Sequence, residues 1–232
     1  MFGFTYLDGI AFVAFIIAWI AYHLMMEGGW AERRSFNRRM DTFRQQWMQR
    51  MLARDNRIVD AQIVAALQNG TAFFASTSLL AIGATLAILQ STDAVMAIFA
   101  DLPFVEPNRT SWEVKTLGLT IIFANAFFKF AWAYRLFNYT TILLGSTPPA
   151  RDAATPEAQA HARKAARMAT LAGRHFNRGQ RAFFFALAYL GWYINGWAFM
   201  ITTFAIFMVM MNRQFGKDAQ WILDDDTSER QS

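Results

Sequence analysis

The chain contains no cysteine, which excludes disulfides, thiolate metal sites and cysteine nucleophiles. Histidine is also scarce, and the three residues His23, His161 and His175 are too scattered to form a recognisable metal motif. The sequence has neither a Gly-rich phosphate loop nor a nucleophile elbow. It therefore predicts no metal and no other cofactor, and it predicts that the protein is not an enzyme.

The abundant residues are apolar. Of 232 residues, 55% are hydrophobic and 16% are aromatic, which is too apolar for an ordinary soluble domain. The apolar residues gather in four runs, at about 4–26, 63–89, 116–144 and 182–211, and each run can cross roughly 30 Å of hydrocarbon as a helix. The sequence thus predicts one all-α membrane domain over residues 1–211, a four-helix bundle, followed by an acidic external tail over 212–232.

Basic residues lie mostly in two connections. The segments 27–62 and 145–181 hold eight and seven of the 22 Lys and Arg residues, whereas the connection around Arg109 holds one. Because positive charge accumulates on the cytoplasmic side, the two basic segments are predicted to be inside and both termini outside. Charges split between two juxtamembrane segments do not form a nucleic-acid surface. Short connections and the lack of a secretory signal favour a bacterial inner membrane.

The first basic segment predicts an amphipathic helix. Its apolar residues recur at helical spacing, and they are Phe36, Met40, Phe43, Trp47 and Met51. Two positions fit such a helix: in the plane of an anionic leaflet, or packed on a neighbouring helix of this protein or of another subunit. In the second basic segment, Thr155, Pro156 and Glu157 predict the start of another cytoplasmic helix.

The third apolar run carries two cations, Lys129 and Arg135, near its predicted inner end. They could be interface anchors whose stems reach the head groups, or parts of a structural polar network between helices. They could instead form a site, because four more polar residues fall at the same predicted depth, namely Gln68, Asn69, Asn138 and Arg178. Such a cationic, donor-rich level suits an anionic lipid head group or a small anion.

The leading functional hypothesis is a non-enzymatic membrane protein that binds anionic lipid or a small anion at this inner level, with an oligomeric pore as one form of it. Small residues in the second run favour helix association, so a homo-oligomer or a subunit of a larger membrane complex is expected. One alternative is an accessory or scaffold subunit that docks a partner through the amphipathic helix. The other is a membrane-embedded enzyme.

Three stretches carry a family resemblance: TAFFASTSLL at 71–80, KFAWAYRLFNYTTILLG at 129–145 and HFNRGQRAFFFAL at 175–187. With these motifs the chain resembles the domain of unknown function family 599, over nearly its whole length. The resemblance implies a four-span membrane protein of undefined activity. It carries over no catalytic residue.

Overall fold

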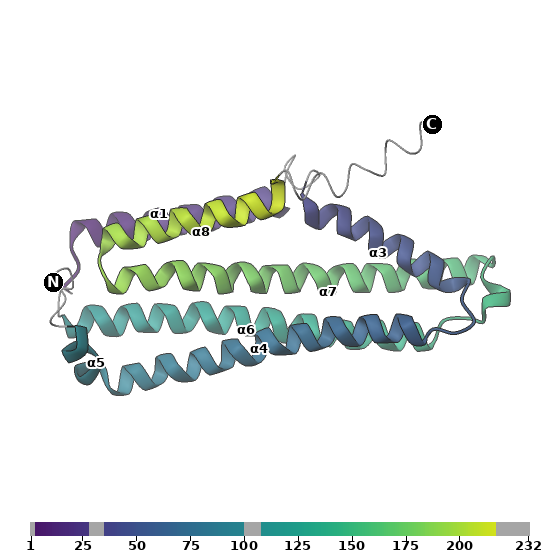
Figure 1. Ribbon diagram of the computed structural model, residues 1–232, viewed down its shortest axis with the longest axis horizontal. Helices are drawn as coiled ribbons and strands as arrows, with labels where there is room; N and C mark the ends of the chain where they lie inside the picture. Colours follow the sequence, from purple (N-terminus) through teal and green to yellow (C-terminus); the bar gives the residue numbers. More distant parts are fainter. Residues whose placement is uncertain (1–2, 28–34, 100–107, 217–232) are drawn as a thin grey trace. The chain divides into compact units, whose positions relative to one another are not determined.

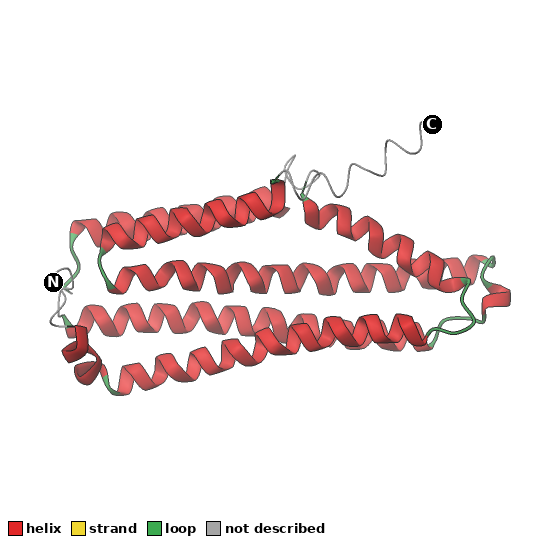
Figure 2. Ribbon diagram, viewed as in Figure 1, coloured by secondary structure: helices red, strands yellow, loops and turns green. Residues whose placement is uncertain are grey.

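The structure is a computed structural model that describes residues 3–27, 35–99 and 108–216, and all regular secondary structure in these ranges is helical (Figures 1 and 2). The α-helices are α1 (Tyr6–Glu27), α3 (Phe36–Leu52), α4 (Ile58–Gln90), α5 (Thr92–Phe99), α6 (Arg109–Gly145), α7 (Pro156–Tyr189) and α8 (Gly196–Phe215). Two short 3-10 helices are η1 (Ala150–Asp152) and η2 (Leu190–Tyr193). The all-α prediction is confirmed, whereas most of the predicted acidic tail, residues 217–232, lies outside the described part of the chain.

Four of the helices, α1, α4, α6 and α8, are long and apolar enough to cross a membrane. At 1.5 Å per residue, the 33 residues of α4 and the 37 residues of α6 extend for roughly 50 and 55 Å. A hydrocarbon core is about 30 Å thick, so both helices are longer than a single crossing requires.

The predicted fourth run, 182–211, is not one helix. α7 begins at Pro156, where the Thr155 hydroxyl accepts the Ala158 N–H at 3.2 Å, and it continues unbroken for 34 residues to Tyr189. The chain then turns through η2, and α8 begins after Asn195, whose side chain accepts the Ala198 N–H at 2.8 Å. The expected second basic helix is therefore the first half of α7, and the break falls inside the apolar run.

The chain forms two compact units. The first comprises Met1–Met40, Ser91–Thr116 and Phe184–Ser232, and the second comprises Asp41–Gln90 and Leu117–Phe183. α3, α6 and α7 contribute residues to both units.

In the first unit, aromatic rings join α1 to the end of α7 and to α8. The Phe15 ring centroid lies 5.6 Å from that of Phe185 and 5.0 Å from that of Phe199. α1 and α8 lie side by side (Figure 1), with Leu7 packed against Gly196 where they start and the Tyr22 hydroxyl 3.5 Å from the Met210 carbonyl near their ends. The two helices therefore run in the same direction.

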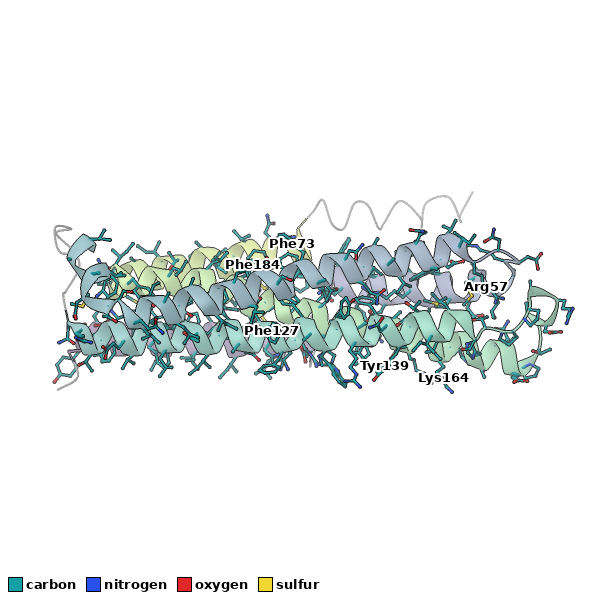
Figure 3. All side chains as sticks on the ribbon, turned by 90° about the horizontal axis from the view of Figure 1, so that it is seen from below. Arg57, Phe73, Phe127, Tyr139, Lys164 and Phe184 are labelled. Atoms are coloured by element: carbon teal, nitrogen blue, oxygen red, sulfur yellow. The ribbon has the colours of Figure 1, made fainter. Side chains whose placement is uncertain are left out.

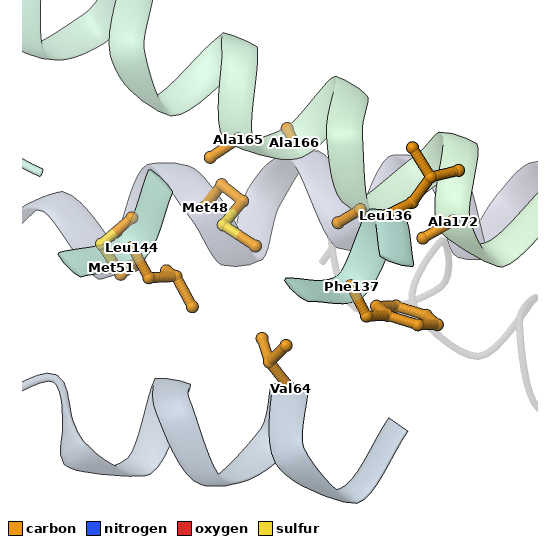
Figure 4. Packing of buried hydrophobic residues seen from close by; sticks show 10 residues of the cluster. Met48, Met51, Val64, Leu136, Phe137, Leu144, Ala165, Ala166 and Ala172 are labelled. Atoms are coloured by element: carbon orange, nitrogen blue, oxygen red, sulfur yellow. The ribbon is translucent and has the colours of Figure 1, made fainter. Parts of the chain in front are cut away.

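In the second unit, four helices share a buried core (Figure 4). α3 supplies Met48 and Met51, and α4 supplies Val64. The other members come from α6 and α7, and they are Leu136, Phe137, Leu144, Ala165, Ala166, Ala169 and Ala172. Because the α7 members are all alanines with small side chains, α3 and α6 can pack close to the α7 backbone. The second half of α3 thus packs on helices of its own chain, which was one of the two positions predicted for the amphipathic helix.

Candidate functional site

The two cations of the third apolar run both lie on α6. Arg135 is exposed, and its Nε–H donates a 2.7 Å hydrogen bond to the hydroxyl of Tyr139, one turn further along. Its guanidinium carbon also lies 5.6 Å from the Tyr139 ring centroid. Lys129 is half-buried. Within the described ranges neither cation has an acidic partner, so both charges remain available to an anion.

α4 reaches this level of α6 through a polar contact. The Gln68 Nε2–H donates to the Asn138 Oδ1 at 2.9 Å, which joins two residues predicted for the site. Asn69 is the next residue on α4 and is exposed. Amide groups at this position can orient a phosphate or a hydroxyl next to the charged side chains.

α7 reaches the same level through an aromatic contact. The ring of His175 lies 6.4 Å from that of Trp132, which is three residues before Arg135. Arg178 is half-buried and follows His175 by about 4.5 Å along the helix axis. α4, α6 and α7 thus meet along the stretch of α6 from Lys129 to Asn138, which covers about 13.5 Å of helix. We call the six predicted site residues at this stretch the belt: Lys129, Arg135, Asn138, Gln68, Asn69 and Arg178.

The buried acids of the second unit are already engaged elsewhere. Asp41, on α3, accepts from Arg44 at 2.7 Å and from Arg174 of α7 at 3.2 Å. Asp60, which is completely buried, accepts from Arg54 at 2.6 Å and from the Trp47 indole at 2.7 Å. These acids join α3 to α7 and to α4, and neither of them pairs with Lys129 or Arg135.

The residues predicted to dock a partner differ in their exposure. Met51 is completely buried and Trp47 is held by Asp60, so neither is available to a partner, which corrects that part of the prediction. Phe36 and Met40 are half-buried, whereas Phe43 is 41% exposed. Phe43 is therefore the most exposed member of the stripe.

The first unit contains a polar cluster that sequence reasoning missed. Lys115 of α6 and Asp8 of α1 are both 7% exposed, and their charged atoms lie 3.7 Å apart. Lys115 also donates to the Trp192 carbonyl at 3.0 Å, and its ammonium lies 5.3 Å from the Trp192 ring centroid. The residues border a cavity of about 200 Å³. Lys115 lies one residue before the predicted third run, and this position is the one feature of the sequence that could have indicated a buried cation.

In the described ranges no three His, Cys, Asp or Glu side chains gather to hold a metal ion. The chemistry that remains is electrostatic. Guanidinium and ammonium groups with amide neighbours bind phosphate or carboxylate oxygens, and arginine can do so with two parallel hydrogen bonds.

The fold and its surface define the class of protein. Large apolar side chains on the candidate spans are exposed, including Ile17 at 61%, Leu80 at 75%, Phe128 at 69% and Phe204 at 65%. Helices of this length with such surfaces belong to a helical membrane protein. The family described as "Protein of unknown function, DUF599" matches residues 10–219, and the chain belongs to this family. Comparison with curated proteins and with solved structures gave no match.

Proposed function

We propose that this protein is a non-enzymatic integral membrane protein that binds anionic phospholipid at its cytoplasmic face, through the belt. The observation that carries the proposal is the pair Lys129 and Arg135, two cations without an acidic partner in the described ranges, on a helix otherwise apolar enough to span a membrane. Charge inside such a helix is costly, and it is usually retained for a purpose.

The level of the belt supports a lipid as the ligand. Arg135 follows Lys129 by six residues, or about 9 Å of helix, so a Lys stem can reach the same head-group layer as the guanidinium. Trp132 lies between them and is 45% exposed, as expected of an aromatic residue at a membrane interface. Each basic group near an anionic surface contributes roughly 1 kcal/mol to the attraction.

The direction of the helices refines the proposed topology. Since α1 and α8 run parallel, the start of α1 and the end of α8 lie on opposite faces if both cross the membrane. This arrangement differs from the prediction made from the charge count alone, which places both termini outside. We place the start of α1 outside and the end of α8 inside, where Arg213 joins the other basic residues. This topology requires α7, whose last turns run antiparallel to α1, to carry the chain back across the membrane before α8.

Native mass spectrometry of the protein, purified in a gentle detergent and exchanged with mixed lipids, tests the belt. The double substitution of Lys129→Gln and Arg135→Gln is expected to reduce retained phosphatidylglycerol at least about five-fold, since two charge-assisted contacts are lost. Retention of phosphatidylcholine should not change. The same spectra give the mass of the assembly, and so they test the predicted self-association.

The matched control is the double substitution of Arg151→Gln and Lys164→Gln, which removes the same charge from exposed positions of the second unit outside the belt. Lys164 projects outward from α7 (Figure 3). Phosphatidylglycerol retention should stay near the wild-type value in this control. Equal losses in both double variants would mean that net charge, and not the belt, attracts the lipid, and the proposal would then be wrong.

A further inference from the structure

A second basic site lies away from the belt, between α3 and α7 in the second unit. The two helices border an open groove of about 580 Å³, a volume within the size range of ligand pockets. We call it the α3–α7 groove. The residues that line it are Thr42, Gln45, Gln46, Gln49, Arg50, Arg163, Ala166 and Arg167.

The charge of the α3–α7 groove has one sign. Three arginines line it, and no acid does. The acid that α3 carries nearby is Asp41, and it is already bound to Arg44 and Arg174. On α7, Glu157 is the sole acid in the 34 residues from Pro156 to Tyr189. Three guanidinium charges therefore face one space with no carboxylate to balance them.

The polar side chains of the groove are also unused inside the protein. Within the described ranges, none of the three arginines, three glutamines or Thr42 makes a hydrogen bond or ion pair with another residue. Arg163 and Arg167 are one helical turn apart on the same face of α7, so their side chains are neighbours. A single ligand can therefore contact both of them, with Arg50 on the opposite wall.

From this geometry we infer that the α3–α7 groove is a binding site for a water-soluble compound that carries a diphosphate. Arginine pairs with phosphate oxygens through two hydrogen bonds at once, and a terminal diphosphate carries roughly three negative charges near neutral pH. Two adjoining phosphate groups match three guanidiniums better than one does. The glutamine amides can serve as further donors to phosphate oxygens or as partners of hydroxyl groups.

The composition of the groove limits how the rest of the ligand is recognised. Its lining contains no aromatic side chain on which a nucleobase could stack, and Ala166 is the one apolar residue that lines it. Recognition therefore centres on the phosphates, with the remainder of the molecule extending into the open space of the groove.

The position along α7 favours a soluble ligand over a bilayer lipid, a step that rests on the proposed membrane level of the belt. Arg167 and Arg163 precede His175 by eight and twelve residues, which is about 12 and 18 Å along the helix. Lipid phosphates at the level of His175 and Trp132 lie that far from the two groove arginines.

Isothermal titration calorimetry of the full chain in nanodiscs of neutral phosphatidylcholine tests the inference, with pyrophosphate, orthophosphate and sulfate as the probes at fixed ionic strength. Pyrophosphate is expected to bind at least about ten-fold more tightly than orthophosphate. Equal affinity for all three anions would overturn the inference.

Variants identify the site. The double substitution of Arg163→Gln and Arg167→Gln should weaken pyrophosphate binding by at least about ten-fold. Arg50→Gln, on the other wall, should weaken it by several-fold and serves as a second test if the double variant folds poorly. Lys164→Gln removes one charge, as Arg50→Gln does, from a position of α7 outside the lining, and it should change the affinity less than two-fold. An unchanged affinity in the groove variants would overturn the inference.

Two further arms separate the sources of the phosphate and the two sites. In nanodiscs that contain phosphatidylglycerol, pyrophosphate should bind as tightly as in neutral ones, whereas loss of binding would show that lipid phosphate fills the groove and would overturn the soluble ligand. The Lys129→Gln and Arg135→Gln double variant should bind pyrophosphate normally. The two proposals can thus be tested independently: pyrophosphate binding in the groove can be confirmed even if lipid binding at the belt is not, and the reverse.

Discussion

The indole N–H of Trp192 donates a 2.6 Å hydrogen bond to the Asp8 carboxylate and so joins residues 184 positions apart in the chain. The second oxygen of Asp8 accepts both the backbone N–H and the hydroxyl of Thr5, at 3.0 and 2.8 Å. Lys115 adds its charge from 3.7 Å. One carboxylate therefore links three parts of the fold, namely the start of α1, the start of α6 and the turn before α8.

Asp8→Ala should destabilise the protein strongly. The substitution leaves Lys115 buried without its counter-charge and the Trp192 indole without its acceptor, and the expected loss is about 3–5 kcal/mol. Thermal unfolding in detergent, followed by circular dichroism, measures it. Asp93→Asn is the control because Asp93 is a 73% exposed partner of Arg109, and such pairs contribute roughly 0–1 kcal/mol. Equal melting temperatures for wild type and Asp8→Ala would contradict the structural role of the cluster.

The turn between α7 and α8 should not tolerate even one added methyl group. A Cβ on Gly191 would overlap the Thr202 hydroxyl and would lie 2.9 Å from the Ala198 carbonyl oxygen. The Thr202 hydroxyl is itself bound to the Ala188 carbonyl at 2.7 Å, so it cannot move away freely. Gly191→Ala should cost about 1–3 kcal/mol in the same thermal assay.

Gly83→Ala is the matched control for this glycine. A Cβ built on Gly83 meets nothing within 4 Å, and alanine stabilises a helix interior by up to about 1 kcal/mol relative to glycine. The control should therefore melt at or above the wild-type temperature. A normal melting temperature for Gly191→Ala would show that α8 does not pack on η2 as closely as described.

The sequence predicted the helices well and their ends less well. Apolar runs and the constant rise of a helix predict a common depth for Arg135, Asn138 and Gln68, and the structure joins two of these residues, Gln68 and Asn138, by a hydrogen bond. The break before α8 was missed because Gly191, Asn195 and Gly196 lie inside an apolar run whose hydropathy does not change there.

The ion pairs and the α3–α7 groove could not be predicted from the sequence. Asp41 and Arg174 are 133 positions apart, and Asp8 lies in a different helix from Lys115. The packing of the helices decides which acid pairs with which base, because nothing in the sequence distinguishes one arginine of the basic segments from another. The α3–α7 groove likewise appears only when α3 is placed against α7, because each helix alone shows an ordinary basic face.

Asp60→Ala should destabilise the second unit. Asp60 is completely buried, and its loss leaves the Trp47 indole N–H and the Arg54 guanidinium without their acceptor, at an expected cost of about 3–5 kcal/mol. Asp55→Ala is the control, because Asp55 is an exposed acid five residues away. Thermal unfolding of both variants measures the difference. Similar melting temperatures would mean that the buried carboxylate contributes little to holding α3 on α4.

The absence of cysteine makes the topology directly testable, because any cysteine introduced is the sole thiol in the chain. Tyr6 is 93% exposed at the start of α1, and Asn212 is exposed in the last turn of α8. With the two helices parallel, Tyr6→Cys should react with a membrane-impermeant maleimide on intact cells, whereas Asn212→Cys should react only after the membrane is opened. The opposite pattern would invert the orientation but keep the helices parallel. Labelling of both positions from the same side would contradict a parallel α1 and α8 that both cross the membrane, and would restore a topology in which both termini lie on one face.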